Sequence, residues 1–475
     1  MKKMHKPIRT LVSVAVAGML SASVAHSGAF SLYSEGTGSA IGNYAAGIAA
    51  EAADASTGWY NPAGLALIHK TQMVGGGVGV FPSSRLNGTS TFTTTGLPNF
   101  VQNFNGLDGA ENALVPSFHY ALPLGENATF GFSAVSPFGL ATDWQTDSEV
   151  RYQTTFTELL TINVSPEIGA KISEHFAVGA GIDFQYARVK YNRMLGVPTL
   201  YAPFNPAAVD TLSYNNGNSI GVGFHTGVMT MFNDQHTRVG LNYQSKMRHK
   251  FHGQSRLTGK LASPGIVLGL PDSVLTANPD AVFKNNQLSS NAVDLPDIVT
   301  LSGYHDLNET IAILGSVVYT GWSSFKDVEL NNVAAPSINP NTTVSLVQVN
   351  RTSAQNYSDV WRFALGANYR VNPLLMLRVG GGYDATPTNN IDRDVRLPDS
   401  NRWALSVGAH YQARPSLGVD VGYTHLFADD PEINRFDRLS ATSTYTVNAT
   451  GKAYADLVGA QVVWTIDKEP ETPYK

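Results

Sequence analysis

Long runs in which apolar residues occupy every second position constrain this fold more than any other feature. In Ser219–Phe232 the even positions are apolar or threonine, and the odd positions include glycines and a histidine. In Thr237–His252 the odd positions are mostly apolar or aromatic and the even positions mostly polar. Because successive side chains of a strand point to opposite faces, both runs predict strands between an apolar medium and water. A soluble sandwich alternates too, so one strand alone does not decide.

The connections between the strand-like runs point to a barrel. Six short segments rich in turn residues fall near 124–127, 173–175, 233–236, 306–309, 371–373 and 413–416. Longer polar stretches separate these hairpins, at about 82–112, 139–158, 194–218, 253–291, 331–355, 387–400 and 429–450. With single strands at about 69–81 and 451–466, the hairpins predict an all-β, antiparallel transmembrane barrel of about fourteen strands over residues 69–466.

The first residues read as an export signal. A basic segment, Met1–Arg9, precedes the apolar run Leu11–Leu20 and then small residues up to Ser27, which predicts a signal peptide at 1–27. An N-terminal anchor is the alternative, but the apolar run is too short to span a bilayer. No later stretch reaches about 18 apolar residues, so the mature chain can enter a membrane only as a closed barrel.

Charge and composition exclude other classes of protein. Without the signal peptide the chain carries 28 basic and 37 acidic residues, a formal charge of −9, which argues against a nucleic-acid partner. There is no cysteine and no metal-ligand spacing, so we expect no metal and no cofactor. We also expect a monomer.

Residues 28–68 predict a plug, or hatch. The stretch 45–55 is rich in alanine, which suggests short helical pieces. Asn61-Pro62-Ala63 reads as a turn or as an asparagine cap with proline at the first helical position. A barrel of this size has a lumen wider than its own side chains fill, so we expect this segment to occupy the remaining space as a plug. A flexible leader is the alternative, and residues 467–475 read as a loose periplasmic tail.

Several motifs together resemble the FadL family of outer-membrane transport proteins, which includes TodX-like channels for aromatic hydrocarbons. The motifs are Gly28-Ala29-Phe30, Ala49-Ala50-Glu51-Ala52-Ala53-Asp54-Ala55-Ser56, Asn61-Pro62-Ala63-Gly64-Leu65, Phe138-Gly139-Leu140-Ala141-Thr142-Asp143-Trp144, Leu295-Pro296-Asp297 and Leu397-Pro398-Asp399. The resemblance covers the whole mature chain. It implies a hatched barrel in the outer membrane of a Gram-negative cell that takes up long-chain fatty acids or other hydrophobic compounds.

The resemblance also implies an inward kink in the third strand, about Thr129–Asp143, that opens a side passage near the Asn-Pro-Ala motif. Ser136, Pro137, Phe138 and Gly139 lie within this strand. Proline cannot donate to the ladder, and glycine permits a bulge, so a break in pairing is expected here. The alternative is that Pro137 simply ends the strand at the membrane surface.

Three residues are candidate contacts inside the barrel. Arg193 falls where the family has an inward basic residue for the head group, although an ordinary solvated charge is the alternative. Arg351 is a second candidate, but it lies two residues before the matching position, which Ser353 occupies. Phe30 is the candidate contact for the acyl tail. A carboxylate needs a cation, and each buried methylene contributes about 0.8 kcal/mol.

Two outer loops are unusually apolar and predict a capture groove. The candidate residues are Leu200 and Phe204 in 197–209, and Ile266 and Leu268 in 264–271. Alternatively the two loops pack against each other and cap the barrel.

One row of basic residues, Arg238, Lys246, Arg248 and Lys250, alternates along a single run. We expect such a row to pair with acids of neighbouring strands inside the barrel, although it could draw anions instead.

The sequence disfavours two functions of other classes. An outer-membrane hydrolase would need a nucleophile motif, and no Gly-x-Ser-x-Gly occurs. A general polar porin would lack a hatch. Within the family, the two arginine candidates favour fatty acids over aromatic hydrocarbons.

Overall fold

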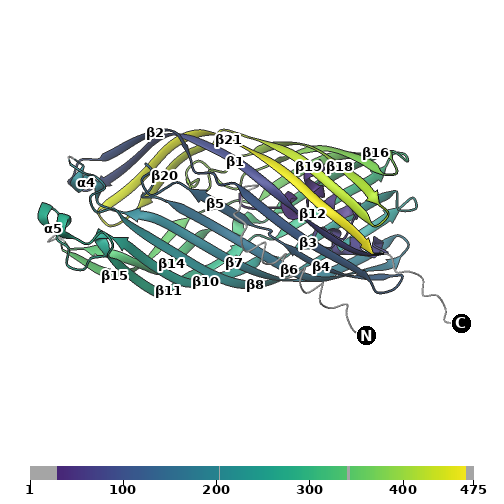
Figure 1. The fold of residues 1–475 in the computed structure, drawn as a ribbon, viewed down its shortest axis with the longest axis horizontal. Coiled ribbons are helices and arrows are strands. Elements are labelled where there is room, and N and C mark those ends of the chain that lie inside the picture. Colours follow the sequence, from purple (N-terminus) through teal and green to yellow (C-terminus); the bar gives the residue numbers. More distant parts are fainter. Residues whose placement is uncertain (1–28, 203, 340–342, 467–475) are drawn as a thin grey trace.

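The described chain forms one closed antiparallel barrel (Figure 1). This computed structural model describes residues 29–202, 204–339 and 343–466, so the expected signal peptide (1–27) and tail (467–475) lie outside it. The barrel closes because the first strand pairs with the last along its whole length, with Thr71 opposite Ile466 and Thr94 opposite Ser443. Among these residues, no helix is long and apolar enough to cross a membrane.

The 21 strand segments of the described residues make 14 barrel strands, because a bulge or bend interrupts seven of these strands. In chain order they are β1 (Thr71–Thr94), β2 (Phe100–Asp108) with β3 (Ala113–Pro123), β4 (Ala128–Val135) with β5 (Gly139–Asp143), β6 (Phe156–Ser173), β7 (Phe176–Leu195), β8 (Thr211–Phe232), β9 (Thr237–Gln244) with β10 (Met247–Gly259), β11 (Val282–Leu295) with β12 (Ile298–Asp306), β13 (Ile311–Thr320) with β14 (Asp327–Ile338), β15 (Val344–Ala354) with β16 (Val360–Asn372), β17 (Leu375–Asp384), β18 (Arg402–Arg414), β19 (Leu417–Ala428) with β20 (Glu432–Arg438), and β21 (Ser443–Ile466). The predicted barrel of fourteen strands is confirmed.

The six predicted turns all join consecutive strands, but the strands are longer than expected. β1 and β21 have 24 residues each, and the stretch 82–112, which reads as a loop, is mostly strand. About 9–11 residues suffice to cross a bilayer, so the outer halves of these strands extend beyond it. These halves are rich in serine, threonine and asparagine and lack an apolar face, which is why the sequence pattern missed them.

Short helices connect the strands at the end opposite the tight turns. They are α4 (Pro198–Tyr201), η4 (Lys260–Ala262) and α5 (Pro271–Thr276), and η5 (Trp322–Ser324) interrupts the ninth strand. Figure 1 shows α4 and α5 at the left-hand end of the elongated barrel.

The tryptophans divide into two groups. Trp361, Trp403 and Trp464 are half exposed, at 51%, 60% and 50%, on strands whose outward residues are apolar, as expected of interfacial anchors. Trp144 and Trp322 are only 1% exposed and belong to the interior.

One strand reverses its faces midway, and this corrects the expectation of a single basic row. β9 ends at Gln244 and β10 begins at Met247, so the two residues between them shift the alternation. Arg238 of β9 points inward, with its guanidinium 4.0 Å from the ring centre of Tyr304. Arg248 and Lys250 of β10 are exposed on the outer wall instead. A one-residue shift moves every following side chain to the opposite face.

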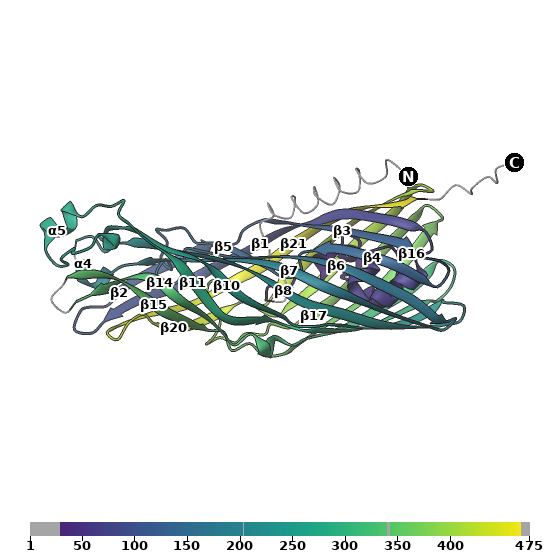
Figure 2. The ribbon, with the colours of Figure 1, turned by 90° about the horizontal axis from the view of Figure 1, so that it is seen from below.

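The hatch lies inside the barrel toward its turn end (Figures 1 and 2). It consists of η1 (Ser34–Gly36), η2 (Ser39–Asn43), α2 (Ile48–Glu51), α3 (Thr57–Tyr60) and η3 (Pro62–Leu67). Almost every residue from Ala29 to Ile68 is buried.

The hatch backbone rests on glycines of the barrel wall. A Cβ on Gly179 would lie 2.2 Å from the carbonyl carbon of Pro62, and one on Gly380 would lie 2.3 Å from the carbonyl oxygen of Asn43. Glycine within a strand often marks such a close approach of another backbone. These contacts fix the distance between hatch and wall.

We therefore predict that Gly179→Ala displaces the hatch and lowers stability by about 1–3 kcal/mol, because a Cβ would overlap the Pro62 backbone. Gly75→Ala is the matched control, since its Cβ would meet nothing within 4 Å. The temperature at which the barrel unfolds, seen as a shift on gels, would measure stability. Ion conductance in planar bilayers would measure how tightly the hatch closes the lumen. Equal behaviour of the two variants would contradict a hatch held by glycine contacts.

Candidate functional site

The wall has a gap between the second and third strands. Below the gap, Phe118 of β3 pairs with Ala134 of β4, and above it an isolated bridge joins Ala110 to Thr142. These two pairs have the same register. Residues 111–117 and 135–141 therefore lie between them without a shift in register. Among the described residues, no ladder joins these two stretches to each other. The third strand is therefore broken where the sequence places Ser136-Pro137-Phe138.

The hatch replaces the lost ladder at the break. The amide of Leu32 donates to the carbonyl of Pro137 at 2.9 Å, and the amide of Gly139 donates to the carbonyl of Phe30 at 2.8 Å. Ser31 and Phe138 form an antiparallel bridge. The third strand thus bends inward and pairs with the first described residues of the hatch.

The kink residues are held on the other side by β6. The Thr161 hydroxyl donates to the Phe138 carbonyl at 2.6 Å, and its oxygen accepts the Phe138 amide at 3.0 Å. Ser136 is 2% exposed and Phe138 3% exposed. Pro137 has no amide hydrogen, so it loses no bond where the ladder opens.

The Asn-Pro-Ala motif fastens the hatch to another part of the wall. The Asn61 side chain accepts the Ala63 amide at 3.1 Å, which caps η3 with Pro62 in the first turn. Its amide group donates to the carbonyls of Ala49 at 2.7 Å and of Val228 in β8 at 3.1 Å. The capped turn is as predicted, but its bonds to the wall are with β8, whereas the segment Phe30–Leu32 contacts the kink.

Phe30 lies in a cluster of aromatic rings. Its ring centre is 4.6 Å from that of Trp322, 5.3 Å from Phe325, 6.2 Å from Phe138 and 6.5 Å from Tyr357. Phe30 is 3% exposed. The cluster stands between the gap and the lumen above the hatch.

An apolar cavity of about 840 Å³ opens beside this cluster. Phe30, Phe325 and Tyr357 line it together with aliphatic residues, which are Leu140, Leu159, Val189, Val293, Leu295, Val328, Leu330 and Leu397. Such a lining suits an acyl chain or an aromatic ring.

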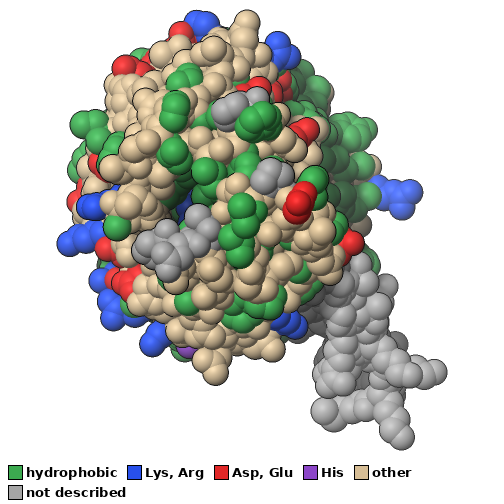
Figure 3. All heavy atoms as spheres, turned by 90° about the vertical axis from the view of Figure 1, so that its left-hand side faces the viewer, with side chains coloured by type: hydrophobic (Ala, Val, Ile, Leu, Met, Phe, Trp, Pro, Cys, Tyr) green, Lys and Arg blue, Asp and Glu red, His purple; other side chains and the backbone are tan. Residues whose placement is uncertain are grey.

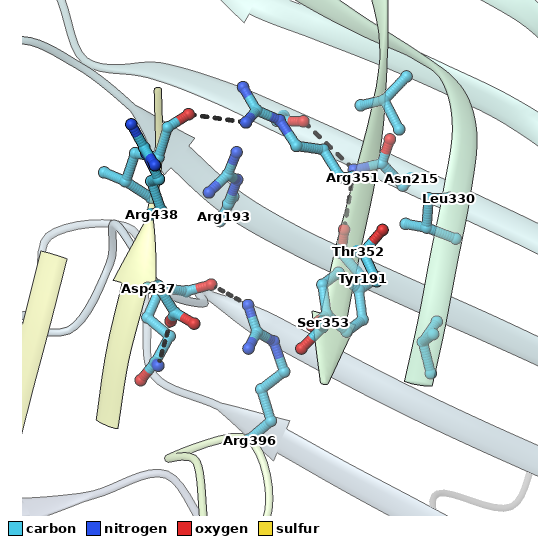
Figure 4. A pocket seen from close by; sticks show the side chains of 15 residues that line it. Tyr191, Arg193, Asn215, Leu330, Arg351, Thr352, Ser353, Arg396, Asp437 and Arg438 are labelled. Carbon is cyan, nitrogen blue, oxygen red and sulfur yellow. Dashed lines mark hydrogen bonds between the residues drawn. The ribbon is translucent and has the colours of Figure 1, made fainter. Parts of the chain in front are cut away.

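A basic cavity of about 710 Å³ lies next to the apolar one. Arg193, Arg351, Arg396 and Arg438 surround it, and Asp437 is its one lining acid (Figure 4). The sequence expectation placed Arg193 and Arg351 together, and both line this cavity.

Within the described chain, the Arg193 side chain has neither a hydrogen bond nor an ion pair, whereas Arg351 and Arg438 donate to carbonyls. Arg396 pairs with Asp394 and stacks 4.2 Å above the ring of Tyr191, and Arg351 donates to the Leu439 carbonyl at 2.7 Å. No acid within the described part of the chain lies at ion-pair distance from Arg193. Asp437 is already paired with the Arg435 side chain, so the cations that line the cavity are in excess of the acids that could neutralise them.

The two cavities adjoin each other. Tyr191, Val328, Leu330 and Arg396 line both. A third space of about 720 Å³ shares Arg193, Arg351 and Ser213 with the basic cavity and reaches the residues of the outer loops. The three spaces thus lie in sequence from the loop end to the aromatic cluster.

The stretch 387–400 was expected among the outer loops, and this was wrong. Its second half, 393–400, is buried in the lumen, where Trp144 Nε1 donates to the Val395 carbonyl at 3.1 Å and the Asp399 carboxylate accepts the Ala29 amide at 3.1 Å. Asp399 also pairs with Arg402 at 2.7 Å. The loop therefore ties the hatch to the wall and supplies Arg396 to both cavities.

Burial by itself lowers the pKa of the Arg396 guanidinium on this loop, but a neighbouring carboxylate outweighs that effect. The carboxylate of Asp394 beside Arg396 raises the pKa of that guanidinium further above its ordinary value, despite desolvation that acts in the opposite direction. Arg396 therefore stays charged at every physiological pH.

The apolar loops contact each other over the barrel mouth. Ile266 and Leu268 are 6% and 2% exposed, and they share one cluster with the partly buried Leu200. Phe204 is 91% exposed. Figure 3 shows that the loop end presents mainly hydrophobic and uncharged side chains. The loops thus pack together, and a capture groove at Phe204 stays a prediction.

Comparisons with known proteins agree on one family. Residues 18–465 match the family described as outer membrane protein transport protein (OMPP1/FadL/TodX). The chain belongs to this family.

Relatives and solved structures agree with this membership. A long-chain fatty acid transport protein of Salmonella typhi is 27% identical over 95% of this chain and 97% of its own length. Outer membrane protein P1 of Haemophilus influenzae is 26% identical over 97% of this chain and 98% of its own. A crystal structure of a Pseudomonas aeruginosa FadL homologue has a TM-score of 0.75 at 21% identity, covering 92% of this chain and 99% of that one.

The toluene transporter TodX of Pseudomonas putida shares the fold with a TM-score of 0.58 at 15% identity, over 93% of this chain and 98% of that one. The FadL-family chain is thus an outer-membrane transport protein of a Gram-negative cell, and not an enzyme.

Sequence reasoning missed several cavity residues of this FadL-family protein. Phe325 and Tyr357 come from bends in the ninth and tenth strands, as does Trp322 of the adjoining aromatic cluster, and Arg396 comes from the inward loop. The motif Leu397-Pro398-Asp399 was a usable signal for that loop, because it lies directly after Arg396.

We predict that Asn61→Ala destabilises the hatch by about 1–3 kcal/mol, because buried partners lose their hydrogen bonds. Asn61→Asp keeps the cap but turns an acceptor toward the carbonyls of Ala49 and Val228, so it should destabilise as well. Asn103→Ala, on the exposed outer wall, is the control. Protease sensitivity of the hatch would measure the effect, and wild-type resistance of both Asn61 variants would refute it.

Proposed function

We propose that this FadL-family protein takes up long-chain fatty acids, with the carboxylate in the basic cavity and the tail in the apolar cavity. The observation that carries the proposal is that the basic and the apolar cavity adjoin each other and share Tyr191, Val328, Leu330 and Arg396 in their linings. A relative of this chain is named a long-chain fatty acid transport protein, which supports the same substrate class.

The carboxylate has a natural partner in this arrangement. Arg193 lines the basic cavity without an acid of its own, and charge-assisted hydrogen bonds between arginine and carboxylate are strong. The tail then extends past Leu330 toward Phe30 and Tyr357, where each buried methylene contributes about 0.8 kcal/mol.

The ligand leaves sideways in this proposal. The aromatic cluster around Phe30 adjoins both the apolar cavity and the kink, and the gap beyond it faces the membrane between β3 and β5. A greasy ligand that passes through the gap never needs to enter the aqueous periplasm. The segment Phe30–Leu32 must separate from the kink for this step.

A second candidate is uptake of aromatic hydrocarbons, as named for the toluene transporter TodX. Edge-to-face packing among Phe30, Trp322 and Phe325 offers ring faces that a small aromatic molecule could share. This ligand would not need Arg193.

We predict that Arg193→Ala weakens oleate binding by about 10- to 100-fold, because a hydrogen bond to a charged group contributes about 1.5–3 kcal/mol. Oleyl alcohol, which has the same tail without the charge, should bind both proteins alike. Calorimetry or fluorescent displacement in detergent would measure the two ligands. Unchanged oleate affinity, with toluene bound tightly, would favour the hydrocarbon channel.

We predict that a disulfide between Ser31→Cys and Phe138→Cys blocks uptake. The two residues form an antiparallel bridge, whose geometry suits a disulfide, and the chain has no other cysteine. Oxidised protein should lose uptake of labelled oleate in vesicles, and reduction should restore it to the level of the single variants. Transport at the same rate in both redox states would exclude an exit that needs the hatch to leave the kink.

A further inference from the structure

The outer wall carries a basic patch, which adjoins the apolar cavity only at its edge, where Lys190 also lines that cavity. Seven cationic side chains point outward from neighbouring strands, and we call them the basic wall patch. They are Arg188 and Lys190 on β7, Lys246 just before β10, Arg248, Lys250 and Arg256 on β10, and Lys284 on β11. Figure 2 shows β7, β8, β10 and β11 side by side on one face of the barrel.

Strand pairing brings these side chains together. Arg188 lies opposite Asn218 of β8, which lies opposite His252 of β10. Arg256 lies opposite Tyr214 on one side and opposite Lys284 on the other. The patch is thus continuous, with uncharged asparagines of β8 between its two basic edges.

Acids neutralise only part of this charge. Glu158 pairs with Arg188 at 2.8 Å and with Lys190 at 3.1 Å. Asp294 pairs with Arg248 at 2.8 Å and with Lys246 at 3.5 Å.

Three cations of the patch are left over. Within the described part of the chain, no ion pair joins Lys250, Arg256 or Lys284 to an acid. The mature chain is acidic as a whole, so this local excess of positive charge stands out against its average. The patch therefore has a net positive charge, which complements an anionic partner.

An apolar strip borders the patch. Ile220, Val222 and Phe224 of β8 point outward and are 74%, 62% and 50% exposed. They run beside the first half of β10, where the Lys250 amide donates to the Ser219 hydroxyl at 3.1 Å. The ring of Phe224 is 5.9 Å from that of Tyr243, a residue suited to the membrane interface.

The reversal of faces between β9 and β10 creates this arrangement. Outward residues of β9, including Leu241 and Tyr243, are apolar or aromatic, and outward residues of β10 are basic. Without the two residues inserted after Gln244, Arg248 and Lys250 would point into the lumen. The wall therefore changes from a lipid-facing surface to an anion-attracting one along a single strand.

We propose that the basic wall patch binds the phosphorylated glycolipid of the outer leaflet, lipopolysaccharide, through its lipid A phosphates. The acyl chains would lie on Ile220, Val222 and Phe224, and the phosphates would meet Lys250, Arg256 and Lys284. A free soluble anion would gain nothing from the apolar strip, whereas a lipid uses both parts. The charges lie on the outside of the wall, where the ligand is already present in the membrane.

The test compares two triple variants of the full barrel in nanodiscs with bis-phosphorylated lipid A as the probe. Lys250→Ala/Arg256→Ala/Lys284→Ala should weaken lipid A binding by roughly 100-fold, at about 1 kcal/mol for each cation near a charged lipid surface. Arg85→Ala/Arg414→Ala/Lys452→Ala removes the same charge from exposed positions elsewhere and should bind like wild type. Native mass spectrometry would count the bound lipid.

Further measurements distinguish binding of a lipid from binding of free phosphate, and loss of the binding site from loss of the fold. Lipid A without phosphates should bind the wild type as weakly as the patch variant binds intact lipid A, and millimolar inorganic phosphate should not compete. Oleate affinity should be unchanged in both triple variants, which shows that the barrel is intact. Equal lipid A binding by the two triple variants, or full competition by inorganic phosphate, would overturn the proposal.

Discussion

The hydrogen bonds between Phe30–Leu32 and Pro137–Gly139 are the constraint on which the rest of the structure depends. A barrel in lipid cannot leave backbone groups unsatisfied, so a wall can open only where another partner takes over. Here the hatch takes over, and Thr161 satisfies the remaining groups of Phe138. The same contacts fix Phe30 in the aromatic cluster, so the gap, the plug and the apolar cavity form one mechanical unit.

Charge inside the barrel is arranged around that unit. Most buried arginines are paired, as Arg402 is with Asp399 and Arg378 with Asp420 at 3.2 Å. Arg193 departs from this rule and faces a cavity that can hold a ligand. Burying an unpaired charge is costly, and this cost is the physical basis for the proposed anionic ligand at Arg193. The loop that carries Arg396 joins this site to the hatch through Asp399.

The sequence predicted the site in parts. Phe30, Arg193, Arg351 and the Ser136–Gly139 break were expected and lie along one path. Trp322, Phe325 and Tyr357 could not be predicted, because they enter the lumen at irregular bends that have no period. The outward turn of Arg248 and Lys250 was also missed, because two residues after Gln244 reverse the faces without breaking the pattern of residue types.

Local chemistry by itself determined the strand alternation, the tight turns, the capped turn at Asn61 and the weak point at Pro137, since each depends on neighbouring residues. The tertiary structure alone decided which face of each strand points inward, how far the strands extend, and that residues 393–400 fold into the lumen. Those outcomes depend on the register between strands and on partners far apart in the chain, such as Ala29 with Asp399. A single strand carries no information about either.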